Sequence, residues 1–117
     1  MKYTPTTVAG VTIIDIEPSC DHRGFVSQSF CAEEFADIGL IADVVQTNIA
    51  FTHTRGTVRG LHRQAPPHAE AKLIRCTRGA VAVMMDVDRL LAKSSTYDPS
   101  VIPARMSPPC QLVHFSE

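Results

Sequence analysis

The chain has 117 residues, of which 44% are hydrophobic and 20% charged, and its formal net charge at pH 7 is −1. This size and composition predict one globular domain, and the near-neutral charge argues against a broad basic surface, so we expect no nucleic-acid partner. No stretch approaches the roughly 20 apolar residues of a membrane span or the apolar core of a signal peptide, so we expect a cytoplasmic protein without membrane contact.

In chain order, runs rich in β-branched and aromatic residues alternate with turn signals such as Asp21-His22-Arg23-Gly24, Arg55-Gly56 and Arg78-Gly79. This rhythm predicts many short strands. We expect strands over residues 11–16, 25–30, 44–51, 57–62, 71–77 and 80–87.

One short helix is predicted over residues 31–39, where Phe35 and Ile38 are spaced for one face and Gly39 can end the helix. From Lys93 on, the chain holds four of its eight prolines, and this stretch is expected to continue the sheet poorly, as a loose tail. The elements together predict an all-β sandwich or jelly roll with one short helix.

Four cysteines, Cys20, Cys31, Cys76 and Cys110, contain no C-x-x-C pair, so we interpret them as reduced thiols used in packing.

Polar residues that could carry chemistry concentrate in residues 56–64 and 68–76. On an ideal strand His62 and Arg59 would face apart, but Gly60 between them could introduce a bulge that changes this. In the second stretch, His68, Glu70 and Lys72 share a face. A histidine with cations nearby suits removal of a proton beside a carbonyl, since the imidazole takes the proton and the cations stabilise the enolate oxygen. Such chemistry needs no metal and no organic cofactor.

Four motifs occur in order: Asp21-His22-Arg23-Gly24-Phe25, then Gln46-Thr47-Asn48, then residues 59–64 with sequence RGLHRQ, then residues 72–76 with sequence KLIRC followed by Gly79. This ordered set resembles the dTDP-4-dehydrorhamnose 3,5-epimerase family. The resemblance implies a cupin-type jelly roll, a homodimer with strand exchange, and cofactor-independent epimerisation beside the ketone of a dTDP-4-keto-6-deoxyhexose.

The resemblance also implies roles for individual residues. His62 matches the general base, and Lys72 matches the lysine near the keto oxygen of the substrate. Substrate-binding roles are implied for the remaining matches, which are Arg23, Phe25, Gln28, Gln46, Asn48 and Arg59. The arginines suit the diphosphate, because a guanidinium can donate two parallel hydrogen bonds to phosphate oxygens.

Two positions depart from the family pattern. Gln28 stands where the family usually has glutamate, which predicts an altered nucleotide contact, and Arg63 stands where an aromatic residue is common. The segment 81–89 resembles a family strand only with an insertion of about two residues.

The resemblance ends after Ser94-Ser95-Thr96-Tyr97, so we divide the chain into an epimerase-like jelly-roll domain, residues 1–97, and a divergent proline-rich tail, residues 98–117. The family's tyrosine acid and the aspartate that orients the base have no counterpart in that tail, and the barrel could be incomplete.

Two alternatives stay open. The chain could be a catalytically impaired sugar-nucleotide-binding or structural protein, or a metal-binding cupin using His53, His62, His68 and Glu70, although the spacing lacks a close His-x-His pair.

Overall fold

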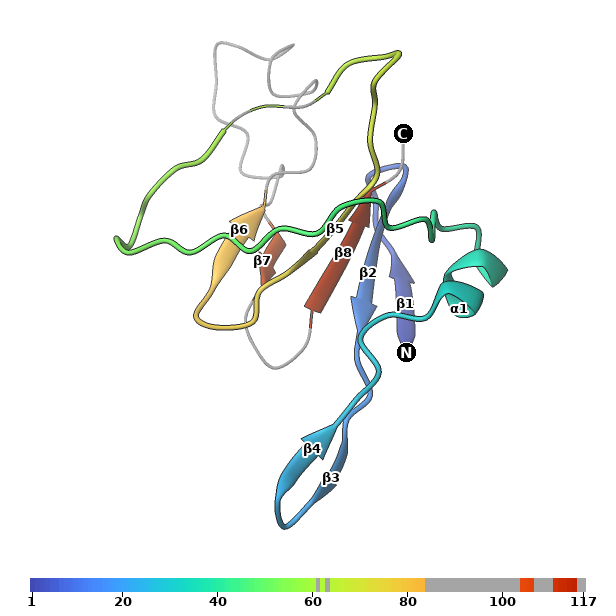
Figure 1. Cartoon of the computed structure of the whole chain (residues 1–117), viewed down its shortest axis with the longest axis vertical. Coiled ribbons are helices and arrows are strands. Elements are labelled where there is room, and N and C mark those ends of the chain that lie inside the picture. The colour runs from blue at the N-terminus through green and yellow to red at the C-terminus, as the bar shows by residue number, and fades with distance from the viewer. Residues whose placement is uncertain (61, 63, 84–103, 107–110, 116–117) are drawn as a thin grey trace.

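The computed structural model of the protein describes residues 1–60, 62, 64–83, 104–106 and 111–115, and within these residues the chain forms short strands and one helix (Figure 1). In chain order the elements are β1 Lys2–Pro5, β2 Val11–Asp15, β3 Ser19–Asp21, β4 Gly24–Val26, α1 Ala32–Asp37, β5 Lys72–Arg75, β6 Val81–Val83, β7 Ala104–Met106 and β8 Gln111–Phe115.

Four strands form one antiparallel sheet in the order β1-β2-β8-β5. Strand β8 lies between β2 and β5, with Ile13 opposite Val113 on one side and Ile74 opposite Val113 on the other. Two separate two-stranded sheets accompany it: the β3–β4 hairpin, which extends away from the larger sheet, and the β6–β7 pair (Figure 1).

The apolar core is small and divided between the two faces of the four-stranded sheet. Ile14 and Phe35 are almost completely buried, at 0% and 1% exposure, and they pack with Ile16, Tyr3 and Leu73. Val11 forms a second cluster, with Val8, Ile74, Cys76 and Val83 around it. Because neighbouring strand residues point to opposite faces, Leu73 lies on the face with Phe35, whereas Lys72 and Ile74 lie on the face with Val11.

Helix α1 is held to the sheet by its aromatic residue and by one polar contact. The Phe35 ring meets the rings of Phe30 and Tyr3 edge to face, with centroids 4.9 and 6.0 Å away. The Tyr3 hydroxyl donates to Glu34 Oε2 over 2.9 Å. Burial, and to a smaller extent this hydrogen bond, raise the pKa of Tyr3 above its ordinary value. Beyond the helix, Gly39 has a φ of 76°, as the predicted stop requires.

Several predicted elements are confirmed in whole or in part. Four expected strands form, each shorter than predicted or displaced: those at 11–16, 25–30, 71–77 and 80–87 correspond to β2, β4, β5 and β6. The expected helix corresponds to α1. Residues 84–87 of the last predicted strand lie outside the described residues, as do Arg63, the turn at 94–97 and Cys110. The described cysteines, Cys20, Cys31 and Cys76, are free thiols.

Two predicted strands do not form where the structure describes them. Residues 44–51 and 57–60 adopt no strand, and the apolar side chains of Val45 and Ile49 are 96% and 99% exposed. A run of β-forming residues becomes a strand only when another strand supplies hydrogen bonds. Residues 44–51 have no such partner among the described strands.

The expectation that the chain after Lys93 joins the sheet poorly is wrong for two segments. Strand β7 pairs with β6, and β8 occupies an inner position of the four-stranded sheet. The prolines are compatible with this because β7 and β8 contain none. The division of the chain at residue 97 stays a prediction.

The predicted fold class is confirmed as an all-β fold with one short helix, and no closed barrel forms from the strands that are described. No helix in the described residues is long and apolar enough to cross a membrane.

Candidate functional site

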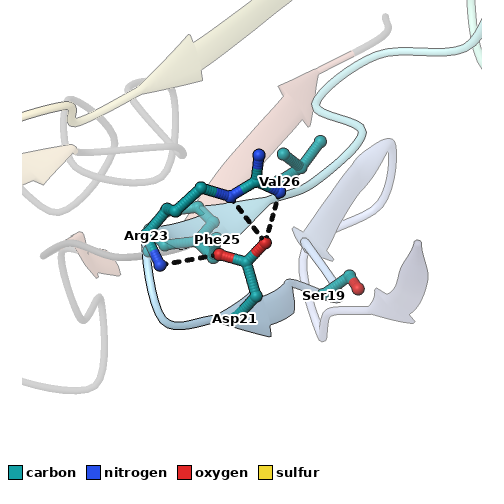
Figure 2. A pocket seen from close by; sticks show the side chains of 6 residues that line it. Ser19, Asp21, Arg23, Phe25 and Val26 are labelled. Atoms are coloured by element: carbon teal, nitrogen blue, oxygen red, sulfur yellow. Dashed lines mark hydrogen bonds and ion pairs between the residues drawn. The ribbon is translucent and has the colours of Figure 1, made fainter.

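A shallow, open hollow of about 320 Å³ lies on the β3–β4 hairpin. Its lining is formed by Ser19, Asp21, Arg23, Gly24, Phe25 and Val26 (Figure 2). The hairpin turns at His22 and Arg23, because Asp21 pairs with Gly24. The positive φ of this turn falls on Gly24, at 134°, a value that side-chain-bearing residues rarely adopt. Two of the predicted substrate-binding residues, Arg23 and Phe25, therefore lie together in one hollow.

Within the hollow, Asp21 holds Arg23 through three hydrogen bonds. The backbone N–H of Arg23 donates to Oδ1 over 2.8 Å, and its Nε and Nη2 donate to Oδ2 over 3.0 and 2.5 Å. Figure 2 shows the guanidinium over the Asp21 carboxylate, with its third nitrogen pointing away from the acid.

The hydrogen bonds from Arg23 lower the pKa of Asp21, chiefly through the side chain and then through the backbone N–H. A carboxyl group with a lowered pKa keeps its negative charge at pH values where an isolated aspartate is already protonated. The pair is therefore complete at neutral pH and is lost only as the pH falls through the lowered pKa of Asp21.

Gln28, also predicted to bind substrate, lies beyond the end of β4 and is exposed, and it does not line this hollow.

The other predicted binding residues lie in the extended segment between α1 and β5. Gln46 Nε2 donates to Asn48 Oδ1 over 3.2 Å, so these two amides form a pair, as residues sharing one side of an extended chain can. Arg59 donates from Nε to Thr52 Oγ1 over 3.2 Å and from Nη2 to the Phe51 carbonyl over 3.1 Å. Arg59 thus holds two parts of this segment together, and neither Arg59 nor the amide pair lines the hairpin hollow.

The predicted base, His62, is exposed and lies against Gly60. Gly60 has a φ of 106°, and a Cβ atom added there would lie 3.1 Å from His62 Nδ1 and 3.3 Å from its backbone nitrogen. Because residues 57–60 form no strand, a bulge at Gly60 stays untested, but the lack of a side chain at Gly60 leaves space for the imidazole.

Lys72 and Glu70 form an ion pair with an Nζ to Oε1 distance of 2.8 Å, at side-chain exposures of 40% and 47%. Gln64 joins them: in the amide orientation that satisfies both of its polar atoms, its nitrogen donates to the two Glu70 oxygens over 3.0 and 3.2 Å. Glu70 was expected only to share a face with Lys72, and the structure makes it the partner of the predicted catalytic ammonium.

The described residues do not test whether the two predicted catalytic groups share one site. Neither His62 nor Lys72 lines the hairpin hollow, and no described hydrogen bond or ion pair joins them. Asp21 also lines the hairpin hollow; it stands in the motif Asp21-His22-Arg23-Gly24-Phe25, but the motif predicted no binding role for it.

The described residues contain no group of three histidine, cysteine, aspartate or glutamate side chains able to hold a metal ion. His53 packs its ring edge to face on Phe51, with centroids 4.7 Å apart.

Comparison with known proteins gives the class of the chain. The model of the family described as dTDP-4-dehydrorhamnose 3,5-epimerase matches residues 5–102, a range that contains every candidate site residue. This match covers well over half of the sequence, and the chain belongs to the dTDP-4-dehydrorhamnose 3,5-epimerase family.

Individual relatives agree with this assignment. The chain is 40% identical to a dTDP-4-dehydrorhamnose 3,5-epimerase of Sinorhizobium fredii over 85 residues, which cover 69% of the chain and 42% of the relative. It is 36% identical to the enzyme of the same name from Shigella flexneri over 96 residues, 81% of the chain and 51% of the relative. A dTDP-4-dehydrorhamnose 3-epimerase of Streptomyces niveus is 35% identical over 82 residues, 69% of the chain and 39% of the relative.

The chain thus spans about half, or less, of the length of these curated relatives. No solved structure shows a significant match to it.

Proposed function

We propose that this chain binds a dTDP-4-keto-6-deoxyhexose and removes a proton from a ring carbon beside the ketone, as a step of rhamnose-type deoxysugar biosynthesis. Family membership carries this proposal, because the matched range includes His62, Lys72 and the two arginines. Relatives named as 3,5-epimerases and as 3-epimerases point to the same class of reaction.

In the proposed step, the His62 imidazole accepts the proton, and the electron pair of the broken C–H bond moves into the carbonyl group to give an enolate. The Lys72 ammonium stabilises the negative oxygen of that enolate more than it stabilises the neutral ketone, which lowers the barrier. No cofactor takes part. Glu70 accepts from one of the three N–H donors of the Lys72 ammonium over 2.8 Å, which leaves two donors for the keto oxygen.

The diphosphate is assigned to Arg23 and Arg59, with Phe25, Gln28, Gln46 and Asn48 as further substrate contacts. The hairpin hollow of about 320 Å³ is at the lower end of ligand-pocket sizes, so it suits part of a sugar nucleotide. The remaining contacts would come from the segment that holds Gln46 and Arg59, closing on the same ligand.

A second candidate is a chain that binds a sugar nucleotide without turnover. One observation favours it: no described hydrogen bond or ion pair joins His62 and Lys72. Binding requires only the arginine side of the site, whereas epimerisation also requires a proton donor on the opposite face of the sugar.

The two candidates are separated by hydrogen exchange. The chain is incubated in heavy water with a dTDP-4-keto-6-deoxyhexose, and deuterium in the recovered sugar is measured by mass spectrometry. We expect incorporation by the wild type and at least about a hundredfold less by His62→Asn, a loss in the range of general-base catalysis. His53→Asn, which changes an exposed histidine packed on Phe51, is the control and should exchange normally.

Binding of dTDP without any exchange would favour the second candidate. Exchange that survives His62→Asn would remove His62 as the base.

A further inference from the structure

The Asp21–Arg23 pair does more than neutralise two surface charges, because its geometry determines which hydrogen-bond donors of the arginine remain available. A guanidinium carries five N–H donors arranged in a plane. Asp21 Oδ2 accepts from Nε and from one hydrogen of Nη2, on a single edge of that plane.

The donors that remain are both hydrogens of Nη1 and the second hydrogen of Nη2. Nη1 and Nη2 form a second edge of the guanidinium, which also offers two parallel N–H groups. Figure 2 shows Nη1 directed away from the carboxylate. Two parallel N–H groups are the arrangement that forks onto phosphate oxygens. The pair therefore leaves Arg23 with one phosphate-binding edge in a fixed direction.

Without Asp21, this arginine would have to be ordered by the ligand itself. Its side chain is 78% exposed, and a long exposed side chain loses rotamer freedom when it binds. The third bond, from the Arg23 backbone N–H to Oδ1, fixes the carboxylate to the turn, so Asp21 is itself held while it holds the guanidinium.

We propose that Asp21 is a positioning residue that presents the Nη1/Nη2 edge of Arg23 to the diphosphate of the nucleotide. This inference rests on the proposed function for the identity of the ligand. It goes against simple electrostatics, because the negative charge of Asp21 by itself repels a diphosphate. The inference therefore requires that fixing the donor edge outweighs this repulsion, which is weakened by solvent at an exposed site.

The test measures the affinity for dTDP by calorimetry in wild type, Asp21→Ala, Arg23→Ala and the double variant. Asp21→Ala should weaken dTDP binding about three- to tenfold, the size of one side chain's ordering cost. Asp21→Asn keeps an oxygen acceptor and should lie between wild type and Asp21→Ala. Asp37→Ala removes an equal charge from an exposed position in α1 and should leave the affinity unchanged.

The double variant separates positioning from a general effect on the hairpin. If Asp21 acts through Arg23, Asp21→Ala should cost nothing in the Arg23→Ala background, and loss of its negative charge could even improve binding there. A hairpin that simply misfolds would lose affinity in both backgrounds. Unchanged or tighter binding by Asp21→Ala alone, or an equal loss in both backgrounds, would overturn the inference.

The experiment also distinguishes this inference from the proposed function. Wild type that does not bind dTDP would overturn both. An Arg23→Ala variant that binds dTDP normally would overturn the positioning role and remove Arg23 from the diphosphate site, but would leave the proposed proton removal by His62 standing. An Arg23→Ala variant that binds weakly beside an unaffected Asp21→Ala variant would overturn the positioning role alone.

Discussion

Among single residues, the proposed chemistry depends most on the contact between Gly60 and His62. The Nδ1 atom of the imidazole would lie 3.1 Å from a Cβ at position 60, closer than atoms normally approach. A methyl group there would force the ring to shift by a few tenths of an ångström. Displacement of a catalytic group by about 1 Å can cost about a hundredfold in rate, so we expect a smaller loss from this shift.

We therefore predict that Gly60→Ala lowers deuterium exchange into the ketosugar by about three- to tenfold. The matched control is Gly56→Ala, because Gly56 also has a positive φ, at 81°, but nothing lies within 4 Å of an added Cβ. Both variants pay a similar backbone cost of about 1–2 kcal/mol, whereas only the first meets the imidazole. Equal exchange rates in the two variants would show that the Gly60 contact does not set the position of the base.

At the scale of elements, α1 illustrates how tertiary packing maintains a helix that could not persist alone. It has six residues and no side-chain hydrogen bond at its N-cap, Cys31, and an isolated helix of this length is unstable in water. Its stability comes from Phe35, which is 1% exposed and packs in the same cluster as Ile14.

Phe35→Ala should accordingly lower the free energy of unfolding by about 3–5 kcal/mol, measured by urea denaturation. Phe25→Ala removes the same ring from a site that is 52% exposed and lies outside the core, and it should change stability by no more than about 0.5 kcal/mol. Similar losses for both variants would mean that α1 does not close the core as described.

The elements that could be predicted from the sequence are those with local signals. The turn at Asp21-His22-Arg23-Gly24, the strand at β2 and the helix stop at Gly39 all follow from residues within a few positions of one another. Strand β8 could not be predicted in this way, because its register depends on residues about a hundred positions away, as in the pairing of Val11 with Phe115. Residues 44–51 show the reverse case: their residue types favour a strand, but no described strand pairs with them.

In the candidate site, too, only the features that depend on neighbouring residues could be predicted from the sequence. The sequence motif predicted that Arg23 and Phe25 belong together, since a tight hairpin brings neighbours into one hollow. It could not show that Asp21 engages the guanidinium or that Glu70 occupies the Lys72 ammonium, because both contacts depend on side-chain orientation. Whether His62 and Lys72 serve one ligand depends on the path of the chain between residues 60 and 72, which no local signal determines.

At the scale of the whole molecule, the described residues leave many large apolar side chains open to solvent. Large apolar side chains are concentrated on the exposed segment that contains Val44, Val45, Ile49 and Phe51. We propose that a second copy of this chain covers them, in a homodimer.

Sedimentation velocity should then detect a dimer at micromolar concentration. The double variant Val45→Asp with Ile49→Asp should shift it toward monomer, because buried unpaired carboxylates are costly. Ala50→Asp, a neighbouring exposed position that presents no large apolar side chain, should perturb the dimer less. A wild type that sediments as a monomer at all accessible concentrations would contradict the proposal.

The proposed function requires that one histidine and one lysine act on the same ketose, with an arginine on its diphosphate. A crystal structure of the chain with dTDP bound measures this most directly. We expect the diphosphate on the Nη1/Nη2 edge of Arg23, and the His62 ring and Lys72 Nζ facing one cavity next to it. A nucleotide bound away from Arg23, or His62 and Lys72 separated by the four-stranded sheet, would contradict this expectation.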